Sequence, residues 1–271
     1  MSIPTSPPDP GSTAGLPPAL ELAGLTKTFH ETRAADAVDL TVPRGCLMGL
    51  VGPNGAGKTT TLSMAVGLLR PDSGTSRIMG EDIWADQASA ARAKRLLGVL
   101  PDGLALPERL TGGELLAYWG RLRGMDRDTI AARTAELLRV LELDEAERAG
   151  ALVIEYSTGM RKKIGLATAL LHAPRVLVLD EPYEAVDPVS GRVLTAILRR
   201  FTAAGGSVVL SSHVMPLVEQ LCDRVAIITD GRGRTEGTLD EVRGGGTLEE
   251  AFVRLAGRRE MGEGELAWLA T

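Results

Sequence analysis

A glycine-rich segment followed by a Lys-Thr pair is the strongest chemical signal in the sequence. Residues 51–60 are Val-Gly-Pro-Asn-Gly-Ala-Gly-Lys-Thr-Thr, which fits the pattern G-x-x-x-x-G-K-[ST]. Glycines let backbone N–H groups turn inward around an anion, and the N-terminus of a following helix adds partial positive charge. Lys58 would then reach the outer phosphates of a nucleotide, and the Thr59 hydroxyl would contact Mg²⁺. The segment therefore predicts a phosphate-binding loop, the alternative being a glycine-rich turn that binds nothing.

The stretches on either side of this loop favour the phosphate-binding interpretation. The apolar run 46–51 predicts a buried parallel strand, and the run 60–69 predicts a helix that ends near Arg70 and Pro71. Strand, loop and helix in this order form the context that a phosphate loop needs. The predicted nucleotide contacts in the loop are Gly52, Asn54, Gly55, Ala56, Gly57, Lys58, Thr59 and Thr60.

A second signal is an apolar strand that ends in two carboxylates. The apolar residues 176–179 run directly into Asp180 and Glu181. A carboxylate at the end of a buried strand beside a phosphate loop can hold Mg²⁺ and its water shell, which is the role predicted for Asp180. Glu181 could orient and deprotonate an attacking water, a contribution of about 10²–10⁴-fold. The alternative is a pair of surface carboxylates that cap the next helix.

Composition limits the class of protein. The 271 residues carry a net charge of −5, and the basic runs Arg161–Lys163 and Arg258–Arg259 are too short to form a basic stripe, so we expect no direct contact with nucleic acid. Cys46 and Cys222 lie in apolar stretches, which favours two buried, reduced thiols in a cytosolic protein over a disulfide. The first 20 residues lack the pattern of a signal peptide, and no run of 18 apolar residues occurs. Any role at a membrane would therefore come through a partner.

The order of predicted elements suggests a main domain with two extensions. The proline-rich residues 1–18 predict a disordered tail, and strands over 19–25 and 34–42 predict a small sheet beside the nucleotide. Helical spacing dominates 111–148, and strands then alternate with helices, which predicts a parallel α/β sheet with ligand groups at the carboxyl ends of its strands. We expect a main domain over 19–242 with a helical insert at about 104–170. A C-terminal extension over 243–271 would contain a helix at 247–255.

Taken together, these motifs resemble the nucleotide-binding subunits of ABC transporters. The order is phosphate loop, helical insert, a Ser-x-Gly turn at 157–159 ahead of a helix, the strand into Asp180-Glu181, then Asp187 and the run Ser-Ser-His at 211–213. The resemblance covers roughly residues 20–242. It implies an α/β fold: a P-loop NTPase core with a parallel sheet, a small N-terminal antiparallel β subdomain and an inserted α-helical subdomain.

The resemblance also implies roles for residues outside the phosphate loop. Ser157 and Gly159 match the turn that caps the γ-phosphate held by the other subunit, and Asp187 matches the aspartate of the dimer-contact loop. On chemistry alone a single histidine at a strand end is more often structural, but the resemblance matches His213 to the switch histidine that reaches the γ-phosphate. Phe29 is similar to the aromatic residue, usually tyrosine, that stacks on adenine, while its spacing alone fits a core aromatic equally well.

Two positions depart from the family pattern. Thr158 replaces a glycine and restricts the backbone of the Ser-x-Gly turn. Asp102 stands where the family usually has a glutamine, so charge replaces an amide donor. We still expect Asp102 to approach Mg²⁺ together with Thr59 and Asp180, with altered coupling as an open alternative.

The resemblance implies an ATP-binding and ATP-hydrolysing subunit of a membrane exporter. Two copies, or one copy with a related chain, would hold two ATP molecules between them and drive a separate transmembrane permease from the cytoplasmic face of the membrane. One alternative is a soluble ATP switch that acts on a non-membrane partner such as a nucleic acid or a ribosome. Another is a weakly hydrolysing regulatory subunit, suggested by Thr158 and Asp102. Retention of the predicted catalytic groups Lys58, Glu181 and His213 argues against that third possibility.

Overall fold

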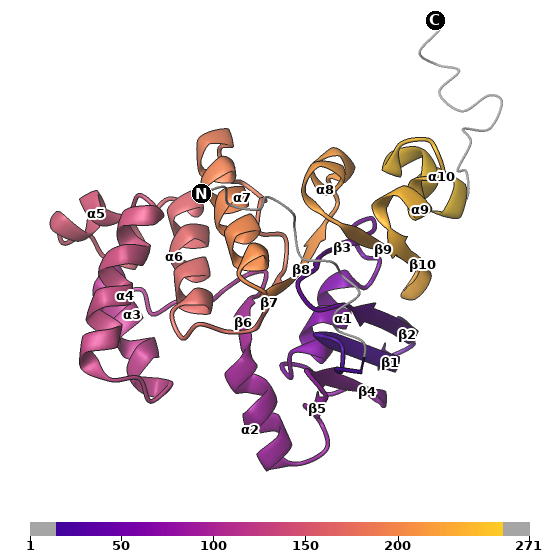
Figure 1. The fold of residues 1–271 in the computed structure, drawn as a ribbon, viewed down its shortest axis with the longest axis horizontal. Coiled ribbons are helices and arrows are strands. Elements are labelled where there is room, and N and C mark those ends of the chain that lie inside the picture. Colours follow the sequence, from indigo (N-terminus) through magenta and orange to yellow (C-terminus); the bar gives the residue numbers. More distant parts are fainter. Residues whose placement is uncertain (1–14, 257–271) are drawn as a thin grey trace, which may run out of the picture.

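The computed structural model describes residues 15–256 (Figure 1). Most of the predicted tail over 1–18 and the last part of the predicted extension over 243–271 therefore lie outside the described residues. The described chain forms two sheets with helices packed around them, and its helical part lies to one side in Figure 1.

A six-stranded sheet forms the centre of the molecule, with the order β10-β9-β3-β8-β7-β6. Its strands are β3 (Leu47–Val51), β6 (Leu97–Leu100), β7 (Val176–Leu179), β8 (Ser207–Ser212), β9 (Arg224–Thr229) and β10 (Arg232–Thr238). All neighbouring pairs are parallel except β9 with β10, which form an antiparallel hairpin. Strand β8 therefore lies between β3, which leads into the phosphate loop, and β7, which leads into Asp180.

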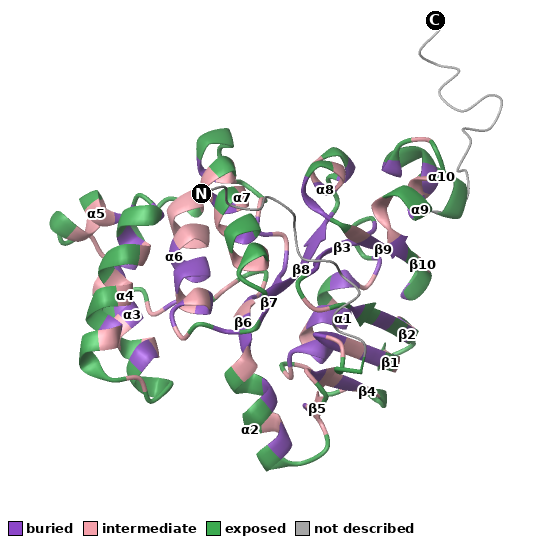
Figure 2. Ribbon diagram, viewed as in Figure 1, coloured by how far each residue is buried: buried purple, intermediate pink, exposed green. Residues whose placement is uncertain are grey.

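The inner strands are apolar throughout because both faces of the sheet are covered. In β7, Leu177 and Leu179 belong to one buried cluster, while Val176 and Val178 belong to the other. The alternation follows the two-residue period of a strand. Figure 2 shows the resulting burial of the central strands, with exposed residues on the outer faces of the helices.

A smaller antiparallel sheet covers one face, as predicted for an N-terminal β subdomain. Its order is β2-β1-β4-β5, from β1 (Leu20–Phe29), β2 (Thr32–Val42), β4 (Ser73–Ile78) and β5 (Glu81–Asp82). Helix α1 (Lys58–Ala65) contributes Leu62 and Met64 to the buried cluster that this sheet shares with the central one. This packing holds α1 in place, and its N-terminus directly follows the glycines of the phosphate loop.

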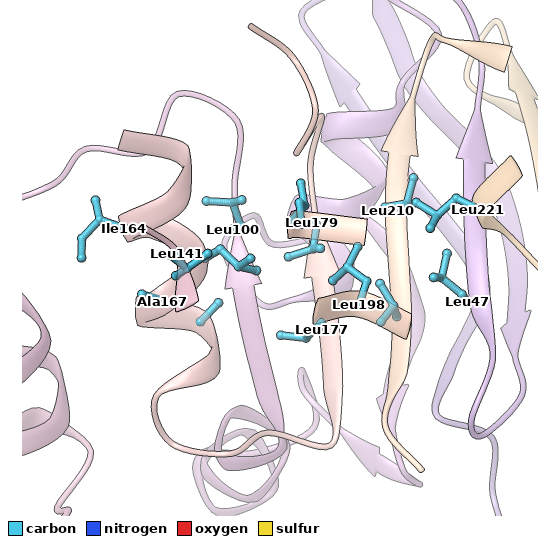
Figure 3. Packing of buried hydrophobic residues seen from close by; sticks show 14 of the residues in the cluster. Leu47, Leu100, Leu141, Ile164, Ala167, Leu177, Leu179, Leu198, Leu210 and Leu221 are labelled. Carbon is cyan, nitrogen blue, oxygen red and sulfur yellow. The ribbon is translucent and has the colours of Figure 1, made fainter. Parts of the chain in front are cut away.

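Helices cover the opposite face of the central sheet. The helices on this face are α6 (Thr158–Leu170), α7 (Pro188–Ala203) and α8 (Met215–Leu221). Helices α3 (Gly112–Leu122), α4 (Arg127–Val140) and α5 (Asp144–Arg148) lie beyond α6, where α3 and α4 pack against it, and the 3₁₀ turn η2 (Val153–Glu155) leads back into α6. Ile164 and Ala167 of α6 belong to the same buried cluster as Leu100 of β6 and Leu141 (Figure 3). This packing fixes α6 against the edge of the sheet.

Three further helices complete the described chain. Helix α2 (Gln87–Leu96) precedes β6, and α9 (Leu239–Arg243) and α10 (Leu248–Ala256) follow β10. The observed α10 lies within one residue of the helix predicted over 247–255. Within residues 15–256, no helix has the length and apolar character needed to cross a membrane.

One predicted boundary is wrong. The helix after the phosphate loop ends at Ala65 rather than near Arg70. Gly67 adopts a left-handed backbone with φ of +81°, and a Cβ there would lie 2.9 Å from Ile83 Cδ1. A continuing helix is incompatible with that conformation. The residues after Ala65 therefore form a tight turn, although their composition favours a helix.

Both cysteines are free and buried, as predicted. Burial raises the pKa of the Cys46 thiol to about 12, and it also raises the pKa of Cys222. Neither thiol forms its reactive thiolate near neutral pH.

The contact between α6 and β6 gives a test of the fold. A Cβ at Gly98 would lie 2.3 Å from the Ala169 carbonyl oxygen, a backbone atom that cannot rotate away. We expect Gly98→Ala to lower the melting temperature by roughly 5 °C or more. Gly191→Ala, within α7, should raise it by about 2 °C, because the new Cβ meets only Tyr183 Cδ1 at 3.8 Å and alanine favours the helix. A melting temperature of Gly98→Ala equal to or above that of Gly191→Ala would contradict this packing.

Candidate functional site

The loops that follow four parallel strands meet at one edge of the central sheet, where ligands bind in open α/β sheets. They enclose a cavity of about 370 Å³ beside the phosphate loop. The predicted site residues that line it are Asn54, Gly55, Ala56, Gly57, Lys58, Thr59, Thr60, Asp102, Glu181 and His213. Residues distant in sequence are thus brought to one place, with the loop between β3 and α1 on one side and the end of β7 on the other.

Two glycines of the loop are required by close backbone contacts. A Cβ at Gly52 would lie 2.2 Å from the Ile228 carbonyl oxygen. Gly57 has φ of +97°, and a Cβ there would lie 2.2 Å from the Ala34 carbonyl oxygen. These contacts hold the loop against β9 and against the segment of β2 around Ala34, so that the loop keeps its curvature.

Lys58 is the cation of the cavity, and only 6% of its side chain is exposed. Its ammonium donates to the Gly52 carbonyl at 2.8 Å and to the Pro53 carbonyl at 3.3 Å. It also lies 3.4 Å from Glu181 Oε1. A buried ammonium held by a loop and facing an anionic oxygen is suited to bind phosphate oxygens in the same place.

Asp180 and Glu181 are oriented by one hydroxyl from the neighbouring strand. Ser211 Oγ donates to Asp180 Oδ1 and accepts the Glu181 N–H at 2.8 Å. Asp180 is buried, and a buried carboxylate is costly unless its oxygens accept hydrogen bonds such as this one. This role of Ser211 is not among the roles predicted from the sequence. The run Ser-Ser-His at the end of β8 was the available signal.

Glu181 meets two predicted catalytic groups. Its Oε1 faces Lys58, and its Oε2 lies 3.1 Å from His213 Nδ1. Its φ of +46° is left-handed, an uncommon conformation for a residue with a side chain. Such backbone strain persists only where the surroundings enforce it and often accompanies functional sites.

Other predicted residues lie outside this cavity. Phe29 ends β1 and is 44% exposed, and Lys27 Nζ lies 5.9 Å from its ring centroid. Ser157 caps α6 by accepting the Met160 N–H at 3.3 Å, and Ser157 and Thr158 are both exposed. The turn that contains Gly159 therefore faces solvent rather than the phosphate loop of its own chain.

Asp187 caps α7 and lies beside the site. Its Oδ1 accepts the N–H groups of Val189 and Ser190, both at 3.0 Å. The Ser190 hydroxyl and these N–H groups hold the pKa of Asp187 below its ordinary value. A second cavity of about 730 Å³ is lined by Asp187 together with Glu181 and His213. The aspartate is therefore ionised and adjacent to the acidic strand end.

The oxygen donors at the cavity suit a hard cation. Thr59 and Asp102 line it, and Asp180 lies at the strand end behind Glu181. Among residues 15–256, no cluster of three or more His, Cys, Asp or Glu side chains is arranged to hold a metal ion. Mg²⁺ commonly uses one or two carboxylates together with substrate phosphates and water, so the residues present fit Mg²⁺ bound with a nucleotide.

Comparisons with known proteins find relatives of this chain. A family model described as "ABC transporter" matches residues 35–184. The daunorubicin/doxorubicin resistance ATP-binding protein of Streptomyces peucetius is 39% identical over 225 residues, which cover 83% of this chain and 67% of that protein. The Nod factor export ATP-binding protein I of Ralstonia nicotianae is 38% identical and covers 86% of this chain and 71% of that protein.

Solved structures show the same fold. An ATP-binding subunit of an ABC transporter superposes with a TM-score of 0.81 at 29% identity and covers 88% of this chain and all 100% of that one. A dimeric ATP-binding cassette bound to ADP and phosphate has a TM-score of 0.73 at 24% identity, with 81% of this chain and 98% of that one covered. The second likeness is evidence of fold alone.

The Ser211 bridge provides a test of the site. Ser211→Ala leaves a buried carboxylate and an N–H without their shared partner, which costs about 1–3 kcal/mol of stability. We expect the rate of nucleoside triphosphate hydrolysis at saturating substrate to fall as well, because Glu181 loses one anchor.

Ser76→Ala is the matched control, because its buried hydroxyl donates to the Ala65 carbonyl at 2.8 Å, outside the cavity. It should lower the melting temperature without changing the saturated rate. Equal saturated rates for the two variants would show that Ser211 does not contribute to hydrolysis.

Proposed function

This chain belongs to the ABC transporter family as an ATP-binding and ATP-hydrolysing subunit, and we propose that it drives a separate membrane-spanning partner in export. The observation that supports the proposal most directly is the meeting of Lys58, Glu181 and His213 in the cavity at the phosphate loop. These are a phosphate-binding cation, a base and a group that can hold the γ-phosphate. One of the relatives above is named for Nod factor export and the other for daunorubicin/doxorubicin resistance.

We assign the hydrolytic step to Glu181 as general base. A water oxygen attacks the γ-phosphorus, its proton passes to the Glu181 carboxylate, and the bond from phosphorus to the ADP oxygen breaks. His213, bonded to the same carboxylate at 3.1 Å, would contact the γ-phosphate. Lys58 must exchange its contact with Glu181 for phosphate oxygens, which frees the carboxylate to accept a proton.

We further propose that Thr59 and Asp180 hold Mg²⁺ and that Asp102 lies next to it. The metal would neutralise charge on the phosphates when bound. Ser211 holds one oxygen of Asp180 by its hydrogen bond. Because Asp102 is 47% exposed and paired with Lys162, we place it at the edge of the metal site rather than at its centre.

The exposed turn at Ser157 and Gly159 supports a dimer. It lies at the N-terminus of the 13-residue helix α6, where N–H groups favour an anion, and it does not line the cavity of its own chain. We propose that this turn caps a nucleotide held by a second copy or a related chain, with Asp187 at the contact. Phe29 would stack on the adenine ring from the end of β1.

We place the chain at the cytoplasmic face of a membrane, bound to a separate permease. The contact surface would include α3–α5 and the loop after β6. That loop lines a further cavity of about 440 Å³ with Leu104, Leu106 and Thr158, which joins the Asp102 segment to the start of α6. An exposed groove of mixed polarity next to the nucleotide site is suited to transmit movement to a partner.

Replacing the proposed base should separate binding from chemistry. Glu181→Gln keeps the shape of the side chain but cannot accept a proton, so we expect ATP binding to persist while turnover falls by at least about 10²-fold. An ATP-bound dimer should accumulate on size-exclusion chromatography. Glu145→Gln, which removes an exposed carboxylate of α5, should behave like the parent. Unchanged turnover in Glu181→Gln would remove Glu181 as the base.

Removing the cavity's lysine should affect binding first. Lys58→Ala deletes a charge-assisted contact worth about 1.5–3 kcal/mol, so the Kd for ATP should rise about 10–100-fold in calorimetric titrations. Lys94→Ala, an exposed lysine of α2, is the control and should leave the Kd unchanged. An unaltered Kd in Lys58→Ala would contradict the phosphate-loop assignment.

A further inference from the structure

The basic triplet Arg161–Lys163, too short to bind nucleic acid, attaches α6 to several segments that are distant in sequence. Arg161 donates to the Val153 carbonyl at 3.3 Å and pairs with Glu108 at 3.2 Å. Lys163 pairs with Glu142 at 3.1 Å. Lys162 instead reaches the nucleotide site, where its ammonium donates to the Glu181 carbonyl at 3.0 Å and lies 3.7 Å from Asp102 Oδ1.

The contact with Glu181 is to backbone, so it acts on the conformation of the residue rather than on its charge. The backbone of Glu181 has a left-handed conformation, with φ of +46°. Ser211 holds its N–H at 2.8 Å and Lys162 holds its carbonyl at 3.0 Å. The peptide groups on both sides of the strained residue are therefore fixed, and this direction of the backbone carries the carboxylate to Lys58 and His213.

Lys162 is well placed to act in this way. Only 17% of its side chain is exposed, and its helix is fixed to the sheet by the buried residues Ile164 and Ala167. Because the helix is packed in place, its ammonium can hold the carbonyl of an adjacent loop in one position. Its contact with Asp102 also neutralises a carboxylate at the position where the family pattern has an uncharged glutamine.

We propose that Lys162 is a positioning residue for hydrolysis, which holds the Glu181 backbone in the orientation that presents its carboxylate to the attacking water. This inference rests on the proposed role of Glu181 as base. It adds a consequence for the dimer. Helix α6 begins at the turn proposed to cap the partner's nucleotide, and one turn later it holds the Glu181 of its own site. Movement of α6 on dimer closure would thus change the geometry of its own base.

The test compares Lys162→Met, Lys162→Gln and Lys162→Arg with Lys163→Met as the matched control. Steady-state hydrolysis gives kcat, and titration with MgATP gives Kd. Lys162→Met removes the donor, so kcat should fall about tenfold or more while Kd stays within about twofold. Lys162→Gln should fall between Lys162→Met and the parent, and Lys162→Arg should keep kcat within about threefold. Lys163→Met should match the parent in both values.

Several results would overturn the proposal. One is an unchanged kcat in Lys162→Met, and another is an equal loss in Lys163→Met, which would show general damage to α6. A rise in Kd that accounts for the loss would make Lys162 a binding residue instead. Recovery of kcat when Asp102→Asn is added to Lys162→Met would show that neutralising Asp102, and not holding the Glu181 carbonyl, is its function.

Glu181→Gln, measured alongside, separates this inference from the proposed function. If Glu181→Gln hydrolyses ATP normally, the base assignment fails, and the positioning role fails with it. If Glu181→Gln is inactive while Lys162→Met keeps full kcat, only the positioning role fails. Melting temperatures of all variants within a few degrees of the parent establish that each one is folded.

Discussion

The close approach of Lys58 to Glu181 is the interaction on which the rest of the site depends. Both side chains are largely buried, with 6% and 13% exposed, and they lie 3.4 Å apart. Buried charges are tolerated only when they are paired and hydrogen-bonded, so the two elements that carry them must stay in register. The phosphate loop holds Lys58 through two of its own carbonyls, and Ser211 and Lys162 hold the peptide groups of Glu181. A triphosphate that binds Lys58 would take the place of the Glu181 carboxylate as the anion paired with its ammonium.

The sheet supplies the register. Strand β8 lies between β3 and β7, and it pairs Leu210 with Leu179, which places Ser211 level with Asp180. Alternating residues of these strands fill two separate cores, so a slip of one residue would exchange the contents of both faces. Packing on both sides therefore fixes the register of the strands and with it the positions of the polar residues at their ends. Helix α6 adds a second connection, because it is packed on the sheet, exposes Ser157 at its start and holds Glu181 through Lys162.

Much of this arrangement could be predicted from local patterns. The phosphate loop, the apolar strand into Asp180 and the alternation of strands and helices follow from residue spacing, and parallel strand ends must meet at one edge. The bond from Ser211 to Asp180 could not be predicted, because it depends on which strand lies between two others. The contact of Lys162 with a carbonyl 19 residues away depends in the same way on packing. The end of α1 could not be predicted, because composition does not show that the chain turns at Gly67 against Ile83. The roles of Phe29, Ser157, Gly159 and Asp187 remain predictions that depend on a second chain or a bound nucleotide.

The most direct test of the account is a crystal structure of the chain with Mg²⁺ and a non-hydrolysable ATP analogue. We expect the phosphates to lie in the cavity, Lys58 to contact phosphate oxygens in place of Glu181, and the metal to lie between Thr59 and Asp180. A structure with the analogue bound in another cavity, or one in which Lys58 keeps its pairing with Glu181 while the phosphates lie elsewhere, would contradict the account.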